Sequence, residues 1–219
     1  MNTQPDFDIT RLQRYLENAA PSVGAIRSAE KFAGGQSNPT YLLQAEEGQY
    51  VLRSKPKGKL LKSAHAVERE FRVMEALAHS PVPVPSVLCL CEDLEVIGAV
   101  FFVMSYEDGP IFWDPALPEL NLDERGTLYR DEIRVLAALH SLDPTGIGLT
   151  DFGRPGSYFE RQIKRWTGQY RASDTTSISA MESLIRWLSE HSPDDDGQTA
   201  LIHGDCRLDN LIMTPEKTR

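Results

Sequence analysis

The sequence has 219 residues, of which 41% are hydrophobic, so the chain is long enough to bury a core as one large domain or two small ones. Its formal net charge of −9 argues against nucleic acid or an anionic membrane surface as the general partner. The longest apolar run, residues 96–104, is far shorter than the ~20 residues that a membrane-spanning helix needs. The N-terminus has no basic and apolar signal regions, and we therefore expect a cytoplasmic location.

The first half of the chain is predicted to be rich in β-structure. Apolar residues at helical spacing predict one helix before the strands and another between them, and prolines end both helices. Short runs of β-forming residues between glycines predict the strands. In chain order these elements are a helix at 8–20, strands at 25–32, 40–46 and 49–55, a helix at 63–79, and strands at 86–92 and 98–106.

The second half is predicted to be mainly helical. The spacing of apolar residues predicts helices at 121–141, 157–171 and 177–190. A β-rich half followed by an α-rich half indicates an α+β fold with two lobes, an antiparallel-sheet N-lobe of residues 1–105 and a helical C-lobe of residues 106–219. "VMSYEDG" is the expected hinge, and a cleft between two lobes is a common place for a ligand.

A concentrated group of polar residues lies near the end of the sequence, in residues 201–213. His203, Asp205 and Asn210 have the H-x-D-x-x-x-x-N spacing of a kinase catalytic loop, in which Asp accepts the proton of the attacking hydroxyl and Asn ligates a metal ion. We expect this loop to follow a short buried strand formed by Leu201 and Ile202. The alternative is that Asp and Asn make the hydrogen bonds of an ordinary turn.

Two further motifs would suit a phosphate-binding site. "GGQSN", residues 34–38, lies between two predicted strands, where Gly34 and Gly35 would let backbone N–H groups approach phosphates closely. An ordinary hairpin turn would also use glycine. "YVLR" places Arg53 at the end of the third strand, where protein kinases have a lysine, and a simple surface arginine is the alternative.

The predicted helix at 63–79 offers a partner for that cation. Val67, Glu70, Met74 and Leu77 recur at helical spacing, so Glu70 lies on the apolar face of the helix. A carboxylate on a buried face is costly unless it is paired, and Arg53 is the expected partner. Three other charged residues lie off this face: Glu68, Arg72 and Glu75.

Together these motifs resemble the aminoglycoside-phosphotransferase-like kinases, which have His-Gly-Asp in the catalytic loop. More narrowly, the chain resembles the branch found as the N-terminal domain of certain multidomain acyl-CoA dehydrogenases and as stand-alone bacterial phosphotransferases. The resemblance covers about residues 9–219 and implies a protein-kinase-like fold with two lobes. The segments that carry it are "GGQSNPTY", "YVLRSKPKGKLLKSAHAVEREFRV", "VIGAVFFVM", "LAALHSLDPTGIGL", "FGRPGSYFERQIKRW" and "HGDCRLDNLIM".

The resemblance implies ATP and Mg²⁺ as cofactors. Asp205 and His203 would be the catalytic residues, and Asn210 would hold the metal. Whether Arg53 or Lys55, on the same strand face, contacts the phosphates is left open. The residues expected to bind the nucleotide are Gly34, Gly35, Ser37 and Asn38 over the phosphates, Arg53 held by Glu70, and Met104 and Tyr106 beside the adenine.

The phosphate acceptor is expected to be a hydroxyl group of a small molecule. The narrower resemblance implies a hydroxyacyl-CoA, whereas the wider family implies aminoglycosides, choline or other amino alcohols. A basic stretch in the second half would suit a coenzyme A phosphate, although a solvated helix face is the simpler interpretation. Its residues are Arg154, Arg161, Lys164, Arg165 and Arg171. The sequence does not indicate the oligomeric state.

One expected residue is missing from the printed sequence. The resemblance implies a second metal-binding Asp in an Ile-Asp-Trp-Glu-like segment after the catalytic loop, but the sequence ends at "MTPEKTR" before it. Asp151, Phe152 and Gly153 spell DFG but precede that loop, and they are expected to form a linker turn. The chain is therefore expected to be a C-terminally truncated kinase. The alternatives are a nucleotide-binding module without turnover and an inactive fragment.

Overall fold

The computed structural model describes residues 5–32, 38–58, 66–154, 156–173, 176, 178–195 and 197–213. Contacts within the chain divide it into two compact units, Met1–His140 with Ile202–Arg219, and Ser141–Leu201. The predicted lobes, residues 1–105 and 106–219, do not coincide with these units, and the lobe boundary at residue 105 stays a prediction.

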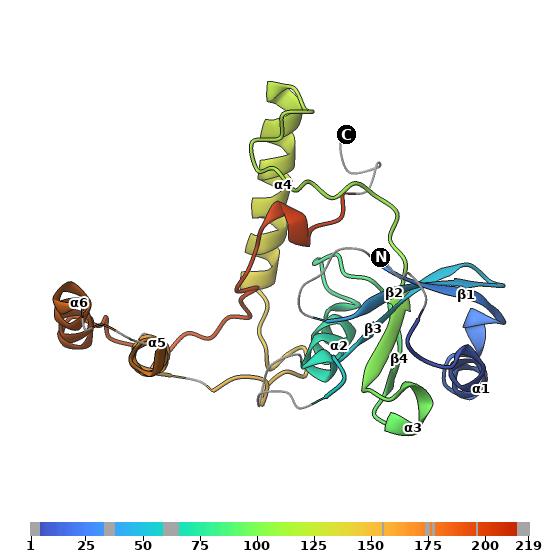
Figure 1. The fold of residues 1–219 in the computed structure, drawn as a ribbon. Helices are drawn as coiled ribbons and strands as arrows, with labels where there is room; N and C mark the ends of the chain where they lie inside the picture. The colour runs from blue at the N-terminus through green and yellow to red at the C-terminus, as the bar shows by residue number, and fades with distance from the viewer. Residues whose placement is uncertain are drawn as a thin grey trace. The chain divides into compact units, whose positions relative to one another are not determined.

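The first unit contains a five-stranded antiparallel sheet (Figure 1). The strand order is β1-β2-β3-β5-β4, so the first three strands form a meander and β5 lies between β3 and β4. All five strands fall within the predicted ranges. Their bounds are β1 (Ile26–Lys31), β2 (Thr40–Ala45), β3 (Gln49–Ser54), β4 (Val87–Cys91) and β5 (Phe101–Ser105).

Helix α1 (Ile9–Ala19) covers one face of the sheet. The Asp8 side chain accepts a hydrogen bond from the backbone N–H of Thr10 at 2.8 Å and so caps the start of the helix. Leu12 and Leu16, one helical turn apart, are buried in a core that they share with side chains from β2, β3, β4 and β5. A 3-10 helix, η1 (Pro21–Val23), follows and leads into β1.

Helix α2 (Val67–Leu77) contacts β4 and β5 on the opposite face of the sheet (Figure 1). The rings of Phe71 and Phe102 meet edge to face, with centroids 6.1 Å apart. Side chains of β3 alternate between the two faces, and Leu52 belongs to the α1 core. Arg53 therefore points to the face that carries α2, as the spacing predicts.

A short helix, α3 (Leu94–Ile97), connects β4 and β5 and was not predicted. Asp93 caps its start, and Gly98 ends it in the left-handed conformation (φ 83°). No helix in the described part of the chain is long and apolar enough to cross a membrane.

The predicted catalytic loop packs near helix α4 (Leu122–His140) within the same unit. Leu208, in the 3-10 helix η2 (Leu208–Asn210), is buried with Leu117 and Leu128. The buried strand predicted for Leu201 and Ile202 is wrong, because both residues lie in irregular backbone and Ile202 is exposed. An isolated strand leaves its backbone groups unpaired, and none of the described strands pairs with this segment.

The second unit contains helices α5 (Tyr158–Ser173) and α6 (Ser179–Glu190), both within two residues of the predicted bounds. The Arg171 guanidinium on α5 forms an ion pair with the Glu182 carboxylate on α6 at 2.8 Å. This pair gives one member of the basic stretch a structural partner within the unit.

Candidate active site

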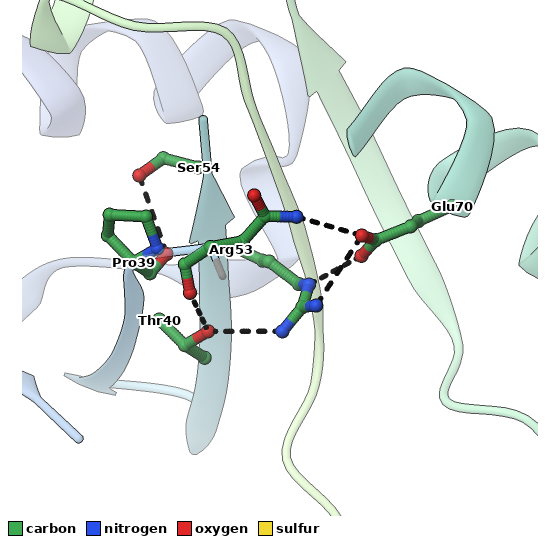
Figure 2. A network of polar contacts seen from close by, with 6 residues as sticks. Pro39, Thr40, Arg53, Ser54 and Glu70 are labelled. Carbon is green, nitrogen blue, oxygen red and sulfur yellow. Dashed lines mark hydrogen bonds and ion pairs between the residues drawn. The ribbon is translucent and has the colours of Figure 1, made fainter. Parts of the chain in front are cut away.

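The centre of the first polar cluster is the ion pair between Arg53 on β3 and Glu70 in the first turn of α2 (Figure 2). Arg53 Nε donates to Glu70 Oε2, and Arg53 Nη2 donates to Glu70 Oε1 at 3.4 Å. The pairing predicted from strand alternation and helical spacing is therefore present. Because a guanidinium presents its donors in one plane, the two contacts hold Arg53 in a defined orientation.

Asn38 and Thr40 complete this cluster. Asn38 Nδ2 donates to Glu70 Oε1 at 2.8 Å, so the carboxylate binds both Asn38 and Arg53. On the other side, Arg53 Nη1 donates to Thr40 Oγ1 at 3.3 Å, and the Thr40 hydroxyl donates to the Asn38 carbonyl at 3.0 Å. Asn38 is only 4% exposed. In the structure its amide supports Glu70, and the expected place of Asn38 over the nucleotide phosphates stays a prediction.

A second ion pair lies beside the first. Lys55 Nζ is 2.7 Å from Glu68 Oε1, so two cations at the end of β3 pair with two carboxylates in the first turn of α2. Carboxylates at this end of a helix are also favoured by the helix dipole. Burial raises the pKa of Glu68, but the hydrogen bond and positive charge of Lys55 outweigh it, and the net effect is a lowered pKa.

The second polar cluster is the predicted catalytic loop. Asn210 Nδ2 donates to Asp205 Oδ2 at 3.1 Å and to the Asp205 carbonyl at 2.9 Å. The Arg207 guanidinium lies 3.2 Å from Asp205 Oδ1 and 3.0 Å from Asp209 Oδ2. The exposed Asp205 carboxylate is thus held from both sides by donors of its own loop, and the predicted pair of Asp205 and Asn210 lies together.

His203 and Gly204 shape the turn that leads to Asp205. The backbone N–H of Asp205 donates to His203 Nδ1 at 3.3 Å, so the imidazole acts as an acceptor in the turn. Gly204 has φ 81°, in the left-handed region that glycine adopts without a steric penalty. This conformation gives a physical reason for glycine between His203 and Asp205.

Cys206 follows Asp205 but does not have the environment of a nucleophile. Its Sγ lies 3.7 Å from the Glu132 carboxylate on α4. Burial, with the nearby negative charge of Glu132, raises the pKa of the Cys206 thiol. The thiol is therefore protonated at neutral pH and packs as part of the loop.

The remaining predicted nucleotide residues fall into two groups. Gly34, Gly35 and Ser37 lie outside the described residues. Met104 and Tyr106, at the end of β5 and just after it, are half-buried. Phe102, two residues before Met104 on the same strand, is fully buried against Phe71, and the place of Met104 and Tyr106 beside the adenine stays a prediction.

Sequence reasoning missed three residues that the structure adds to these clusters. Thr40 is directly opposite Arg53 in the β2–β3 register, a relation that the short turn between the two strands could have revealed. Glu68 precedes Glu70 by two residues, as Arg53 precedes Lys55. For Arg207, the sequence offers no indication of this role except its position midway between Asp205 and Asp209.

Comparisons with known proteins agree on one family. A model of the phosphotransferase enzyme family (APH) matches residues 28–219. Mouse acyl-CoA dehydrogenase family member 10 is 50% identical over 208 residues, covering 94% of this chain and 19% of the mouse protein. Chicken acyl-CoA dehydrogenase family member 11 is 45% identical over 221 residues, 99% of this chain and 28% of that protein. The chain thus spans less than a third of the length of these relatives.

Solved structures show the same fold. A crystal structure from Ralstonia eutropha JMP134, provisionally assigned as an aminoglycoside phosphotransferase, is 44% identical with a TM-score of 0.84, covering 97% of this chain and 62% of that one. The ternary complex of streptomycin, ATP and APH(2″)-IIa is 17% identical with a TM-score of 0.65, covering 95% and 68% of the two chains. At that identity the likeness concerns the fold alone, an α+β fold of the kinase-like type.

Proposed function

Because this chain belongs to the phosphotransferase enzyme family, we propose that it is a kinase that transfers the γ-phosphate of ATP to a hydroxyl group of a small molecule. The observation that carries the proposal is the Arg53–Glu70 ion pair, which has the arrangement that holds a phosphate-binding cation in kinases. Strand alternation in β3 and helical spacing in α2 place Arg53 and Glu70 on faces that meet.

Arg53 retains donors for a phosphate after its protein contacts are counted. A guanidinium has five N–H donors, and the hydrogen bonds to Glu70 and Thr40 use three of them. The other two have no acceptor among the described residues. We assign the phosphate contact to Arg53 and propose that Gly34, Gly35 and Ser37 cover the phosphates and that Met104 and Tyr106 flank the adenine.

Asp205 is the proposed general base. Its carboxylate is exposed and can accept the proton of an acceptor hydroxyl, while Asn210 and Arg207 fix its orientation from the two sides. His203 acts through the turn, by accepting the hydrogen bond of the Asp205 backbone, and so helps to position the base. In this proposal the Asp205 carboxylate, held by residues of its own loop, removes the proton of the acceptor.

Asn210 fits a role as a ligand of Mg²⁺. Its Nδ2 donates to Asp205, which leaves Oδ1 as an acceptor, and oxygen ligands suit Mg²⁺. Mg²⁺ is commonly held by one or two protein oxygens together with substrate phosphates, so one ligand from this loop is compatible with an ion that arrives on ATP. When bound, the ion would neutralise charge on the phosphate oxygens.

For the acceptor we propose a hydroxyacyl-CoA. The support is the similarity to proteins named as acyl-CoA dehydrogenase family members and the basic residues of α5. Arg171 is paired with Glu182, so Lys164 and Arg165 are the better candidates for an anionic group. Aminoglycosides are the alternative acceptors, because the structures with the same fold include a streptomycin complex.

A nucleotide-binding module without turnover is the second candidate function. Among the residues that the structure describes, no cluster of three or more His, Cys, Asp or Glu side chains could hold a metal ion. Fewer protein ligands would weaken charge neutralisation during phosphoryl transfer, which is the main contribution of such sites to the rate. This candidate predicts ATP binding without phosphate transfer to any acceptor.

The Asp205→Asn variant tests the proposed function. With ATP, Mg²⁺ and a panel of hydroxyacyl-CoAs and aminoglycosides, we expect kcat to fall by ~10² to 10⁴ while ATP affinity stays near that of the unmodified chain. Asp209→Asn is the matched control, since it removes a carboxylate from the same loop and from the same arginine. Equal turnover in Asp205→Asn and the unmodified chain would exclude Asp205 as the base, and absence of turnover with every acceptor would favour the module.

A further inference from the structure

The polar contacts around Arg53 form a closed circuit of four residues. Glu70 accepts from Asn38 and Arg53, Arg53 donates to Thr40, and Thr40 donates back to the Asn38 carbonyl. Figure 2 shows the guanidinium between Thr40 on one side and the Glu70 carboxylate on the other. The circuit joins three elements, the start of β2, the end of β3 and the first turn of α2.

Thr40 determines the orientation of Arg53 in a way that the ion pair alone does not. Contacts to Glu70 restrain Nε and Nη2, which lie on one side of the guanidinium. Thr40 Oγ1 accepts from Nη1, on the other side, and the two residues are directly opposite in the β2–β3 register. Restraint on both sides fixes the plane of the group and the direction of its remaining donors.

The burial of polar side chains is concentrated at this corner. Asn38 and Ser54 are the two buried polar side chains in the described part of the chain, and each is 4% exposed. Ser54 binds the Pro39 carbonyl through both its backbone N–H and its hydroxyl. Burying polar groups is costly unless they are hydrogen-bonded. The hydrogen bonds of Asn38 and Ser54 offset this cost and hold the short segment that carries Asn38 and Thr40 in place.

We propose that Thr40 and Asn38 are positioning residues for the phosphate-binding Arg53, with Thr40 fixing the guanidinium and Asn38 fixing its carboxylate partner, Glu70. This inference rests on the proposed function, since it assumes that Arg53 binds a nucleotide phosphate. Asn38 directly follows residues 33–37 in the sequence, which include the glycines expected over the phosphates.

Isothermal titration of the 219-residue chain with ATP and with adenosine tests the proposal. Loss of a residue that positions the phosphate-binding group should weaken the affinity for ATP, which carries phosphates. The affinity for adenosine, which has no phosphate, should not change. Thr40→Val keeps the branched shape and removes the hydroxyl, and we expect ATP affinity to fall about five- to tenfold with adenosine affinity unchanged. Thr40→Ser, which retains the hydroxyl, should restore ATP affinity. If Thr40→Val does not fold by circular dichroism, Thr40→Ala replaces it.

Two further variants separate positioning from stability. Ser54→Ala removes a buried hydroxyl from the same corner but not a contact of Arg53, so the ratio of ATP to adenosine affinity should not change. In an Arg53→Ala background, Thr40→Val should have no further effect on ATP affinity, because Thr40 acts through Arg53. An equal loss in both backgrounds, or full ATP affinity in Thr40→Val alone, would overturn the positioning role. An unmodified chain that binds ATP no more tightly than adenosine would instead overturn the proposed nucleotide site itself.

Discussion

At the scale of single residues, the end of β3 presents two cations to two carboxylates of one helical turn. The Arg53–Glu70 pair is tied into the circuit with Asn38 and Thr40, whereas the Lys55–Glu68 pair stands beside it. Glu68 Oε2 is buried without a hydrogen-bond partner among the described residues. Glu68 therefore depends on the Lys55 ammonium, which donates to Oε1, for the lowered pKa that it has despite this burial.

The pH dependence of stability tests that dependence. The pKa of Glu68 in the folded chain is below its ordinary value of 4.5, so the pair stabilises the chain above pH 4.5, and this contribution is lost as the pH falls through the folded pKa. We expect Glu68→Gln to lower the free energy of unfolding by up to about 1 kcal/mol at neutral pH. In urea unfolding below pH 4.5, the difference in the free energy of unfolding between Glu68→Gln and the unmodified chain should become smaller. Glu75→Gln, on the same helix, is the control, and a Glu68→Gln effect that is constant with pH would contradict the assignment.

Residue-scale prediction from sequence succeeded where a periodic pattern fixed the side-chain direction. Strand alternation placed Arg53, and helical spacing placed Glu70, on faces that meet. Thr40 and Asn38 were not foreseen as supports of that pair, because their roles depend on the register between two strands and on a turn. Such relations are set by tertiary contacts and leave no periodic signal in a single sequence.

At the scale of elements, the predicted catalytic loop is anchored by its apolar side chains, of which Leu208 is the most buried. Leu208 lies between Arg207 and Asn210, is 5% exposed, and packs with Leu117 and Leu128. The polar residues of the loop are mainly exposed, so their positions depend on this anchor and on the hydrogen bonds of η2. A loop can thus present exposed carboxylates in a fixed arrangement without a regular strand before it.

Removal of the anchor should loosen the loop. Leu208→Ala is expected to lower the free energy of unfolding by about 2 to 4 kcal/mol, because a buried leucine leaves a cavity. The backbone N–H groups of Asn210 and Leu211, which donate to the carbonyls of Arg207 and Leu208, should exchange faster with deuterium. Ile212→Ala, at an exposed position of the same segment, should change both quantities less. Equal effects of the two variants would refute the role of Leu208.

Elements themselves were predictable to the extent that their own residues specify them. The five strands and the helices α1, α2, α4, α5 and α6 follow from alternation, helical spacing, glycine and proline. The four-residue helix α3 is too short to show a period. The strand expected at residues 201–202 failed because a strand also needs a neighbour, which the apolar character of Leu201 and Ile202 does not supply.

At the scale of the whole molecule, segments far apart in the sequence belong to one compact unit. In the sequence, residues 141–201 lie between α2 and the predicted catalytic loop, and these residues form a unit of their own. The sheet and α2 nevertheless belong to the same unit as that loop. The predicted lobe boundary at residue 105 follows the change from β-rich to α-rich sequence and stays a prediction, whereas the compact units meet at residues 140–141 and 201–202. The composition of a segment indicates its propensity for helix or strand, whereas compact units depend on contacts between residues far apart in the sequence.

A nucleotide should therefore protect segments from both ends of the sequence. In hydrogen–deuterium exchange of the 219-residue chain, we expect Mg-ATP to slow exchange in residues 38–54, in α2, at residues 104–106 and in residues 203–213, because each contains a proposed nucleotide, metal or catalytic residue. Helices α5 and α6 should exchange as they do without nucleotide. Adenosine is the control ligand. It should slow exchange at residues 104–106 but not in the segments that contain Arg53 and Asn210. If Mg-ATP slows exchange in the other segments but not in residues 203–213, the predicted catalytic loop does not take part in the nucleotide site of this chain. A nucleotide-binding module without turnover would then be the better description of its function.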